Sequence, residues 1–275
     1  MKRWFVVVFM LLGGCASVPN TQQVDTQYGT YTYALSAENE PTVVFESGLG
    51  DDMTSWQAVL EQMTGKARVL SYNRAGFGGS QSSAKARNGA VIVAELKDIL
   101  ETLNLTPPFI LVGHSLGGGY MELFAKTYPN LTAGLVLVDP NASKYPSACK
   151  AQKLEFCDPP SGVPVWASWF LPDAVVGEIS GFAKTHEQIN QIDDFPDVPL
   201  VVLSAPNSRA AETEQQQKAN ALYRLMHQQL AQQSSQSKYV ECEHCSHYLH
   251  QDEPQMVVEA IEWVHLKSKR ADEAQ

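Results

Sequence analysis

The sequence has little positive charge and no apolar run long enough to cross a membrane, and both shortages limit what the protein can be. Lysine and arginine together number 20 against 30 aspartates and glutamates, which gives a formal net charge of −10. No basic patch stands out, so we expect no nucleic acid partner. The apolar stretch over residues 4–12 is too short for a permanent transmembrane helix. No internal repeat is evident, and 275 residues with 44% hydrophobic content suit one globular domain with room for an insertion.

Residues 1–14 have the features of an export signal. A short basic region precedes the apolar stretch, which ends in the letters L-G-G-C at Cys15. This ending resembles a bacterial lipobox, whose cysteine is lipidated, for example with palmitate, and becomes the mature N-terminus; the alternative is an ordinary secretory signal with a chance cysteine. The resemblance implies a membrane partner through Cys15, followed by a polar tether over residues 15–27. Because Ala16 rather than aspartate follows, analogy with Gram-negative sorting favours the outer membrane, facing the periplasm or the surface.

Export implies an oxidising compartment, in which cysteines pair. The four cysteines beyond the lipobox allow three pairings, among which the sequence does not choose, and we favour the two local pairs. These pairs are Cys149 with Cys157 and Cys242 with Cys245. A zinc site is the alternative, because the second pair is crowded with histidines at positions 244, 247 and 250.

Apolar runs alternate with amphipathic helical patterns along most of the chain. Strands are expected at residues 28–35, 42–45, 67–72, 109–112, 133–138, 200–203 and 238–242, and helices at 53–63, 89–103, 120–128, 212–233 and 254–266. Strands that alternate with helices through short loops predict the α/β class, with a mostly parallel sheet covered on both faces. In such sheets ligands bind beyond the carboxyl ends of the strands.

The alternation breaks over residues 141–196, which we interpret as a cap inserted into a core of residues 28–140 and 197–269. Residues 270–275 are expected to form a tail. The inserted segment carries an aromatic cluster, which could line an acyl pocket, form the packing core of the cap or contact a membrane; packing has the higher base rate. The cluster consists of Trp166, Trp169 and Phe170.

The strand expected at residues 109–112 runs into the pattern G-x-S-x-G at residues 113–117. This pattern is typical of a nucleophile elbow, in which a serine sits on a strained strand-to-helix turn. Glycines are needed two residues on either side, because the backbone doubles back and leaves no room for Cβ atoms. The turn would push the Ser115 hydroxyl out of the sheet, beside the N–H groups that open the next helix. The alternative is a glycine-rich turn with a chance serine.

From Tyr28 to Lys267 the chain resembles the α/β-hydrolase fold, with the inserted segment matching least. The letters E-S-G-L-G at residues 46–50 and the segment 71–78 look like the oxyanion loop and the following strand-turn of cap-bearing small-molecule hydrolases. The letters S-H-Y at 246–248 are similar to their histidine loop. The resemblance implies a serine hydrolase that cleaves a small ester or related acyl compound through an acyl-enzyme, without metal or organic cofactor. We expect a monomer.

The resemblance also implies a role for each site residue. Ser115 would be the nucleophile, and His247 the base that takes its proton and later protonates the leaving group. The backbone N–H groups of Leu49 and Leu116 would stabilise the oxyanion. His114 and His250 compete with His247, although a residue beside the nucleophile usually points away from it.

The acid is where the sequence departs from the common pattern. Most members carry it after the strand that is here residues 200–203, but residues 204–208 read S-A-P-N-S and offer no carboxylate. Some members place it one strand after the nucleophile, so we expect Asp139, with Glu212 or Glu214 as alternatives. Asp139 could instead only cap a turn before Pro140. The loop also has Ser47 where a histidine commonly precedes the glycine.

Serine at position 115 argues against the epoxide hydrolases and dehalogenases of this fold, which use aspartate there. Thioesterase, lipase, lactonase and peptidase variants stay open, because fold does not determine substrate. The rival from another class is a catalytically inactive binding or scaffold lipoprotein. Its support is the missing carboxylate after residues 200–203.

Overall fold

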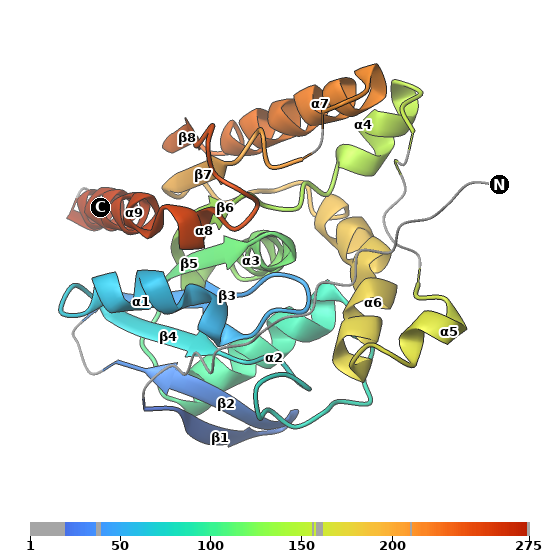
Figure 1. Cartoon of the computed structure of the whole chain (residues 1–275). Coiled ribbons are helices and arrows are strands. Elements are labelled where there is room, and N and C mark those ends of the chain that lie inside the picture. Colours follow the sequence, from blue (N-terminus) through green and yellow to red (C-terminus); the bar gives the residue numbers. More distant parts are fainter. Residues whose placement is uncertain (1–19, 37–39, 156, 158–161, 210, 274–275) are drawn as a thin grey trace.

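An eight-stranded sheet forms the centre of the protein (Figure 1). The structure, a computed structural model, describes residues 20–36, 40–155, 157, 162–209 and 211–273. The strands lie in the order β1-β2-β4-β3-β5-β6-β7-β8. The pairings from β4 across to β8 are parallel, and the two at the β1 edge are antiparallel. This topology confirms the α/β class and the mostly parallel sheet.

The central strands are buried on both faces, which explains why they read as continuous apolar runs. Their parallel register brings their carboxyl ends to one edge of the sheet. The strands are β1 (Gln22–Thr26), β2 (Gly29–Leu35), β3 (Thr42–Glu46), β4 (Arg68–Tyr72), β5 (Phe109–His114), β6 (Thr132–Val138), β7 (Leu200–Ser204) and β8 (Ser237–Glu241).

Helices cover both faces of the sheet (Figure 1). On one face, α1 (Gln57–Met63), α8 (Leu249–Asp252) and α9 (Pro254–Glu273) enclose a core around the fully buried Trp56. On the other, α2 (Gly89–Thr102), α3 (Leu116–Thr127) and α6 (Asp173–Asn190) pack together over a second core. At the β8 edge, α7 (Glu214–Ala231) packs against β7, β8 and α4 (Tyr145–Ala151).

Two segments near the chain ends differ from the sequence predictions. Residues 22–26, which we assigned to the tether, form β1, because Val24 turns inward and the segment pairs antiparallel with β2 from Gln22↔Tyr33 to Thr26↔Gly29. Its polar composition hid this strand. At the other end, α9 continues to Glu273, through most of the expected tail. The signal peptide, Cys15 and the first part of the tether lie outside the described residues.

The segment that we interpret as a cap, residues 141–196, contributes α4, the short α5 (Val165–Ser168) and α6. Helix α6 packs against α2 and α3, two helices that cover one face of the sheet. Its Val175 also lies against the loop that follows β3. Within the described part of the chain, no helix combines the length and apolar character needed to cross a membrane.

Candidate active site

Ser115 lies on the tight turn between β5 and α3, where the sequence pattern predicts it. Its backbone is in an unusual region, with φ of 52° and ψ of −118°, and this strain fits a residue that must leave a strand and enter a helix within one step. A Cβ on Gly113 would lie 2.5 Å from the carbonyl oxygen of Gly117, and a Cβ on Gly117 would lie 2.4 Å from that of Ser47. Neither position therefore has room for a side chain. The helix α3 begins at Leu116, four residues before the expected start.

The sheet register brings Ser115 and Asp139 side by side. His114 pairs with Val138, and Val138 pairs with Leu203, so the residues that follow β5 and β6 leave the sheet at the same level. The ladder continues one step further: the N–H of Ser115 donates to the Val138 oxygen at 3.0 Å, and that of Asp139 donates to the Leu203 oxygen at 2.7 Å. Asp139 then turns away with a φ of 40°, a value few residues other than glycine adopt.

His247 connects these two residues in a hydrogen-bonded chain. Its Nδ1 lies 2.6 Å from Asp139 Oδ2, and its Nε2 lies 2.9 Å from Ser115 Oγ. Because a carboxylate only accepts, Nδ1 carries the proton and Nε2 is free to accept from the serine hydroxyl. Asp139 is 1% exposed, whereas the His247 side chain is 35% exposed and can be reached from solvent. The geometry is that of a serine prepared to lose its proton to a histidine.

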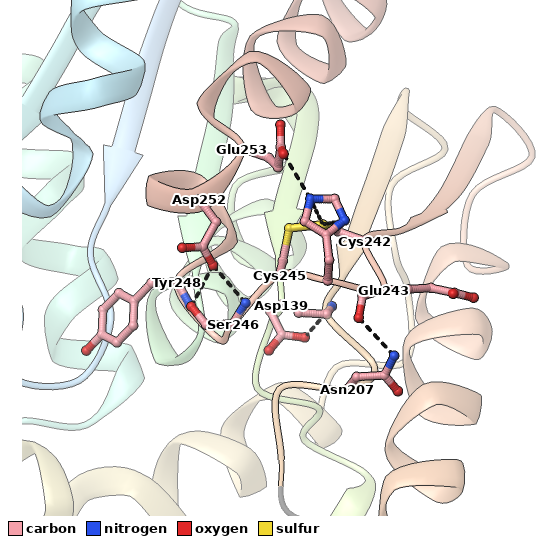
Figure 2. The surroundings of a disulfide bond; sticks show 11 residues. Asp139, Asn207, Cys242, Glu243, Cys245, Ser246, Tyr248, Asp252 and Glu253 are labelled. Atoms are coloured by element: carbon pink, nitrogen blue, oxygen red, sulfur yellow. Dashed lines mark hydrogen bonds and ion pairs between the residues drawn. A yellow bond between two sulfur atoms is a disulfide. The ribbon is translucent and has the colours of Figure 1, made fainter.

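The loop that carries His247 is held by a disulfide and by hydrogen bonds to two other residues (Figure 2). The Cys242–Cys245 disulfide closes it two residues before the histidine. The Asp252 carboxylate accepts hydrogen bonds from Ser246 N at 2.7 Å and from Ser246 Oγ at 2.6 Å. Asn207 Nδ2 donates to the oxygen of residue 243 at 2.9 Å. These anchors restrict where the imidazole can move.

The second carboxylate oxygen of Asp139 contacts groups that the sequence did not point to. Oδ1 accepts a hydrogen bond from the backbone N–H of Ala205 at 3.1 Å and lies 3.9 Å from His227 Nδ1. His227 lies 2.8 Å both from the Pro140 oxygen through Nε2 and from Ser204 Oγ through Nδ1. Since a carbonyl only accepts, Nε2 carries the proton and Nδ1 accepts from the serine.

His227 was missed because it lies in a glutamine-rich helix, α7, with no motif around it.

The surroundings determine the charge on Asp139. Burial favours the neutral acid, but the hydrogen bonds from His247 and from the backbone N–H of Ala205 outweigh it, so the pKa of Asp139 falls below its ordinary value. Burial also lowers the pKa of His227 itself, which stays neutral at physiological pH. The site therefore holds an ionised carboxylate next to the histidine that contacts Ser115.

The loop after β3 carries the expected oxyanion donor Leu49. The loop turns tightly, with a hydrogen bond from Asp51 N to the Gly48 oxygen at 3.2 Å. The Ser47 hydroxyl, which stands where a histidine is common, donates to the Asp52 oxygen at 2.9 Å. The other expected donor, Leu116, is the first residue of α3, where backbone N–H groups have no partner within the helix.

The competing histidines lie beside His247 but not in its place. His114 Nε2 donates to the backbone oxygen of His247 at 2.8 Å, and its ring packs against the tilted ring of His250, with 4.4 Å between the ring centroids. Burial lowers the pKa of His114 well below its ordinary range and lowers the pKa of His250 to about 3. Both rings are neutral, buried packing groups, and His114 fixes the backbone of His247.

The two alternative acids are exposed to solvent. Glu214 lies in the first turn of α7, where it pairs with Lys218 and is 80% exposed, and Glu212 is exposed as well. Of the three carboxylates considered, Asp139 is the one that contacts His247.

Both local disulfides predicted from the sequence are present, Cys149–Cys157 and Cys242–Cys245. The Sγ atoms of the second pair lie near His244, but in a disulfide they carry no thiolate for zinc.

The aromatic cluster of the inserted segment does not form a packing core. Trp166, Trp169 and Phe170 are 65%, 80% and 81% exposed. The expectation from base rates was therefore wrong: the described part of the segment packs through α4 and α6 instead, with Cys149 and Ile189 fully buried.

A mostly parallel sheet that presents a serine elbow, a histidine loop and a carboxylate at the ends of its strands defines a hydrolase of the α/β class. Comparison with known proteins agrees. The model of the alpha/beta hydrolase family matches residues 43–260. The chain is 26% identical over 223 residues to the uncharacterized protein YqjL of Bacillus subtilis strain 168. This alignment covers 80% of the chain and 81% of YqjL.

Solved structures show the same fold. A thermophilic esterase from Thermogutta terrifontis superposes with a TM-score of 0.60 at 20% identity, covering 90% of this chain and 99% of the esterase. The enol-lactonase from Burkholderia xenovorans LB400 gives 0.62 at 18% identity, covering 89% of this chain and 100% of the lactonase. The chain therefore belongs to the alpha/beta hydrolase family, and hydrolysis is the class of reaction that its fold supports.

Proposed function

We propose that the protein is a serine hydrolase that cleaves a small ester or related acyl compound through an acyl-enzyme. The observation that carries the proposal is the continuous hydrogen-bonded chain from Asp139 through His247 to Ser115. A buried, ionised carboxylate at one end and a serine on a strained turn at the other are what nucleophilic catalysis by serine requires.

In the first half of the reaction, Ser115 Oγ attacks the acyl carbon while His247 Nε2 takes its proton. Asp139 stays ionised and stabilises the imidazolium that forms. The N–H groups of Leu49 and Leu116 stabilise the negative oxygen of the tetrahedral intermediate. His247 then gives the proton to the leaving alcohol, and the carbon–oxygen bond of the ester breaks. In the second half, water loses a proton to His247 and attacks the acyl-enzyme. His247 then returns this proton to Ser115 Oγ as the bond between Oγ and the acyl carbon breaks, which releases the acid and the free serine.

An ester-type substrate is supported by the structural neighbours, two of which are an esterase and an enol-lactonase. Both names describe hydrolysis of a carbonyl–oxygen bond, which the proposed mechanism performs without a metal or an organic cofactor. The side chain at position 115 is also the hydroxyl that an acyl-enzyme needs.

Reaction with a fluorophosphonate probe tests the proposal. We expect wild-type protein to be labelled at Ser115, as mapped by peptide mass spectrometry, and to hydrolyse p-nitrophenyl esters of some chain length. Ser115→Ala should abolish both. Folded wild-type protein that is neither labelled nor active on the ester series would instead support an inactive binding protein of this fold.

We also propose that the chain is a monomer held at the bacterial envelope by a lipid on Cys15, with the outer membrane as its site. The supporting features are the basic N-terminus, the short apolar stretch and the lipobox-like ending. Metabolic labelling with palmitate tests the lipid: incorporation should require Cys15. In Cys15→Ser, loss of label with release from membranes is expected, and persistent membrane binding would contradict the anchor.

A further inference from the structure

One buried guanidinium, that of Arg74, holds the loop after β3. The Arg74 side chain is 2% exposed. Nη1 donates to the Ser47 oxygen at 2.8 Å, and Nη2 donates to the Gly48 oxygen at 2.7 Å. The other donors go to carboxylates. Nη1 reaches Glu46 at 2.7 Å, while Nε and Nη2 form a fork on Glu178 at 2.6 and 3.0 Å. All five N–H bonds of the guanidinium are used.

This contact fixes the direction of the Leu49 N–H. The cis peptide bonds of the described residues precede Pro41 and Pro108, so the Gly48–Leu49 bond is trans. In a trans peptide the C=O and N–H point in opposite directions. Because the Gly48 oxygen is bound by Arg74, the Leu49 N–H points away from the buried guanidinium. A rotation of this peptide would remove the donor and leave a buried cation with an unused N–H bond.

The same guanidinium ties the loop to the inserted segment. Glu178 belongs to α6 and is completely buried. Besides Arg74, its carboxylate accepts a hydrogen bond from Gly50 N at 3.3 Å. The loop therefore contacts α6 through its backbone and through Arg74, and α6 cannot move away without breaking a buried ion pair. Breaking such a pair is costly, because an uncompensated charge would be left inside the protein.

We propose that Arg74, held by Glu46 and Glu178, is a positioning residue that orients the Gly48–Leu49 peptide for oxyanion stabilisation. Catalysis then requires α6 to be docked on the loop. This inference rests on the proposed function, because it assigns the Leu49 N–H to a reaction at Ser115. It also supplies the support that the loop lacks where Ser47 replaces the common histidine.

Lysine cannot replace arginine here, because an ammonium offers three donors from one point and cannot bridge two carbonyl oxygens and two carboxylates. We therefore compare Arg74→Lys with the matched control Arg87→Lys in the full-length protein. Arg87 forms an equally buried ion pair with Glu95 at 2.6 Å, but Glu95 belongs to α2 rather than to the loop. Both variants should lose stability, as measured by thermal unfolding, so activity separates the two roles.

In Arg74→Lys we expect kcat for a p-nitrophenyl ester to fall about 10- to 100-fold with KM changed less than about 3-fold, since an oxyanion donor acts mainly in the transition state. Inhibition by an alkyl boronic acid, whose serine adduct is a tetrahedral anion, should weaken by a similar factor. Arg87→Lys should keep kcat within about 3-fold. Equal effects of the two variants on kcat and on boronate affinity would overturn the inference.

Glu178→Gln provides a second variant if Arg74→Lys does not fold. It keeps Arg74 and a hydrogen-bonding side chain but removes the charge that docks α6, so we expect kcat and boronate affinity to fall about 3- to 10-fold together. A Glu178→Gln enzyme with wild-type kcat and boronate affinity would refute the link to α6. Failure of the proposed function looks different, because the wild-type protein itself would then neither hydrolyse esters nor bind the boronate.

Discussion

Replacing Asp139 by asparagine is a sharp test of the site, because the structure dictates how the new amide must lie. The backbone N–H of Ala205 donates to Oδ1, so in the variant the amide oxygen has to occupy that position. The amide nitrogen then faces His247 Nδ1, where Oδ2 accepts a hydrogen bond in the wild type. An NH₂ group only donates, so Nδ1 loses its proton and Nε2 gains one. His247 would then donate to Ser115 instead of accepting from it.

The expected loss in kcat is about 10⁴-fold, the effect that the same change of tautomer has in the serine protease triad. The fold should survive, because aspartate and asparagine have nearly the same shape and the Ala205 hydrogen bond is kept. Reaction with the fluorophosphonate should slow by a comparable factor, since it also requires deprotonation of Ser115.

Steady-state kinetics on the best p-nitrophenyl ester measures the effect, with circular dichroism to confirm folding. Glu214→Gln is the control, because this carboxylate was a candidate from the sequence but is exposed and paired with Lys218. Its kcat should equal that of the wild type. If Asp139→Asn retains kcat within about 10-fold, Asp139 does not orient His247 for catalysis, and the proposed chain of proton transfer is wrong.

Two further predictions concern stability. Burial raises the pKa of Asp51 from 3.8 to about 6, so the folded state binds more protons than the unfolded state between these values, and the free energy of unfolding falls as pH rises through them. Asp51→Asn should remove this fall. Measured by urea unfolding, the variant should gain up to about 3 kcal/mol in free energy of unfolding at pH 7.5 but little at pH 3.5. An equal effect at both pH values would contradict this prediction. Replacing Cys242 and Cys245 by alanine should lower the free energy of unfolding by about 2 kcal/mol, as expected for a four-residue loop. The change should lower kcat less than about 10-fold, because Ser246 stays bound to Asp252. A loss of kcat as large as that of Asp139→Asn would be inconsistent with this view.

The sequence was sufficient to predict the parallel sheet, because its buried strands are apolar throughout and alternate with amphipathic helices. It was also sufficient to predict where Ser115 would lie, since only glycine fits at positions 113 and 117 of such a turn. Strand β1 could not be recognised, because a short polar edge strand has one inward residue, Val24, and no alternating pattern. The exposure of Trp169 was not predictable either, since base rates describe average burial and not a particular helix.

The support for the site is what sequence reasoning missed, because it depends on contacts between distant segments. Arg74 and Glu178 are 104 positions apart and are joined by two hydrogen bonds. His227 and Asp139 lie in a helix and a strand end with no shared motif. Pairs of buried charges offer no periodic signal, so only the folded chain shows that Glu178 of the inserted segment reaches the loop after β3.

The position of the acid follows from the geometry of neighbouring parallel strands. β6 and β7 are paired in register, and neighbouring strands lie about 5 Å apart, so a carboxylate after either strand can reach the same imidazole. Here the carboxylate follows β6, and the residues at the end of β7 make other contacts. The N–H of Ala205 binds Asp139 Oδ1, and Ser204 donates to His227, which lies beside the same oxygen. In place of a carboxylate, the end of β7 thus supplies a backbone N–H group, that of Ala205, which favours the ionised form of Asp139.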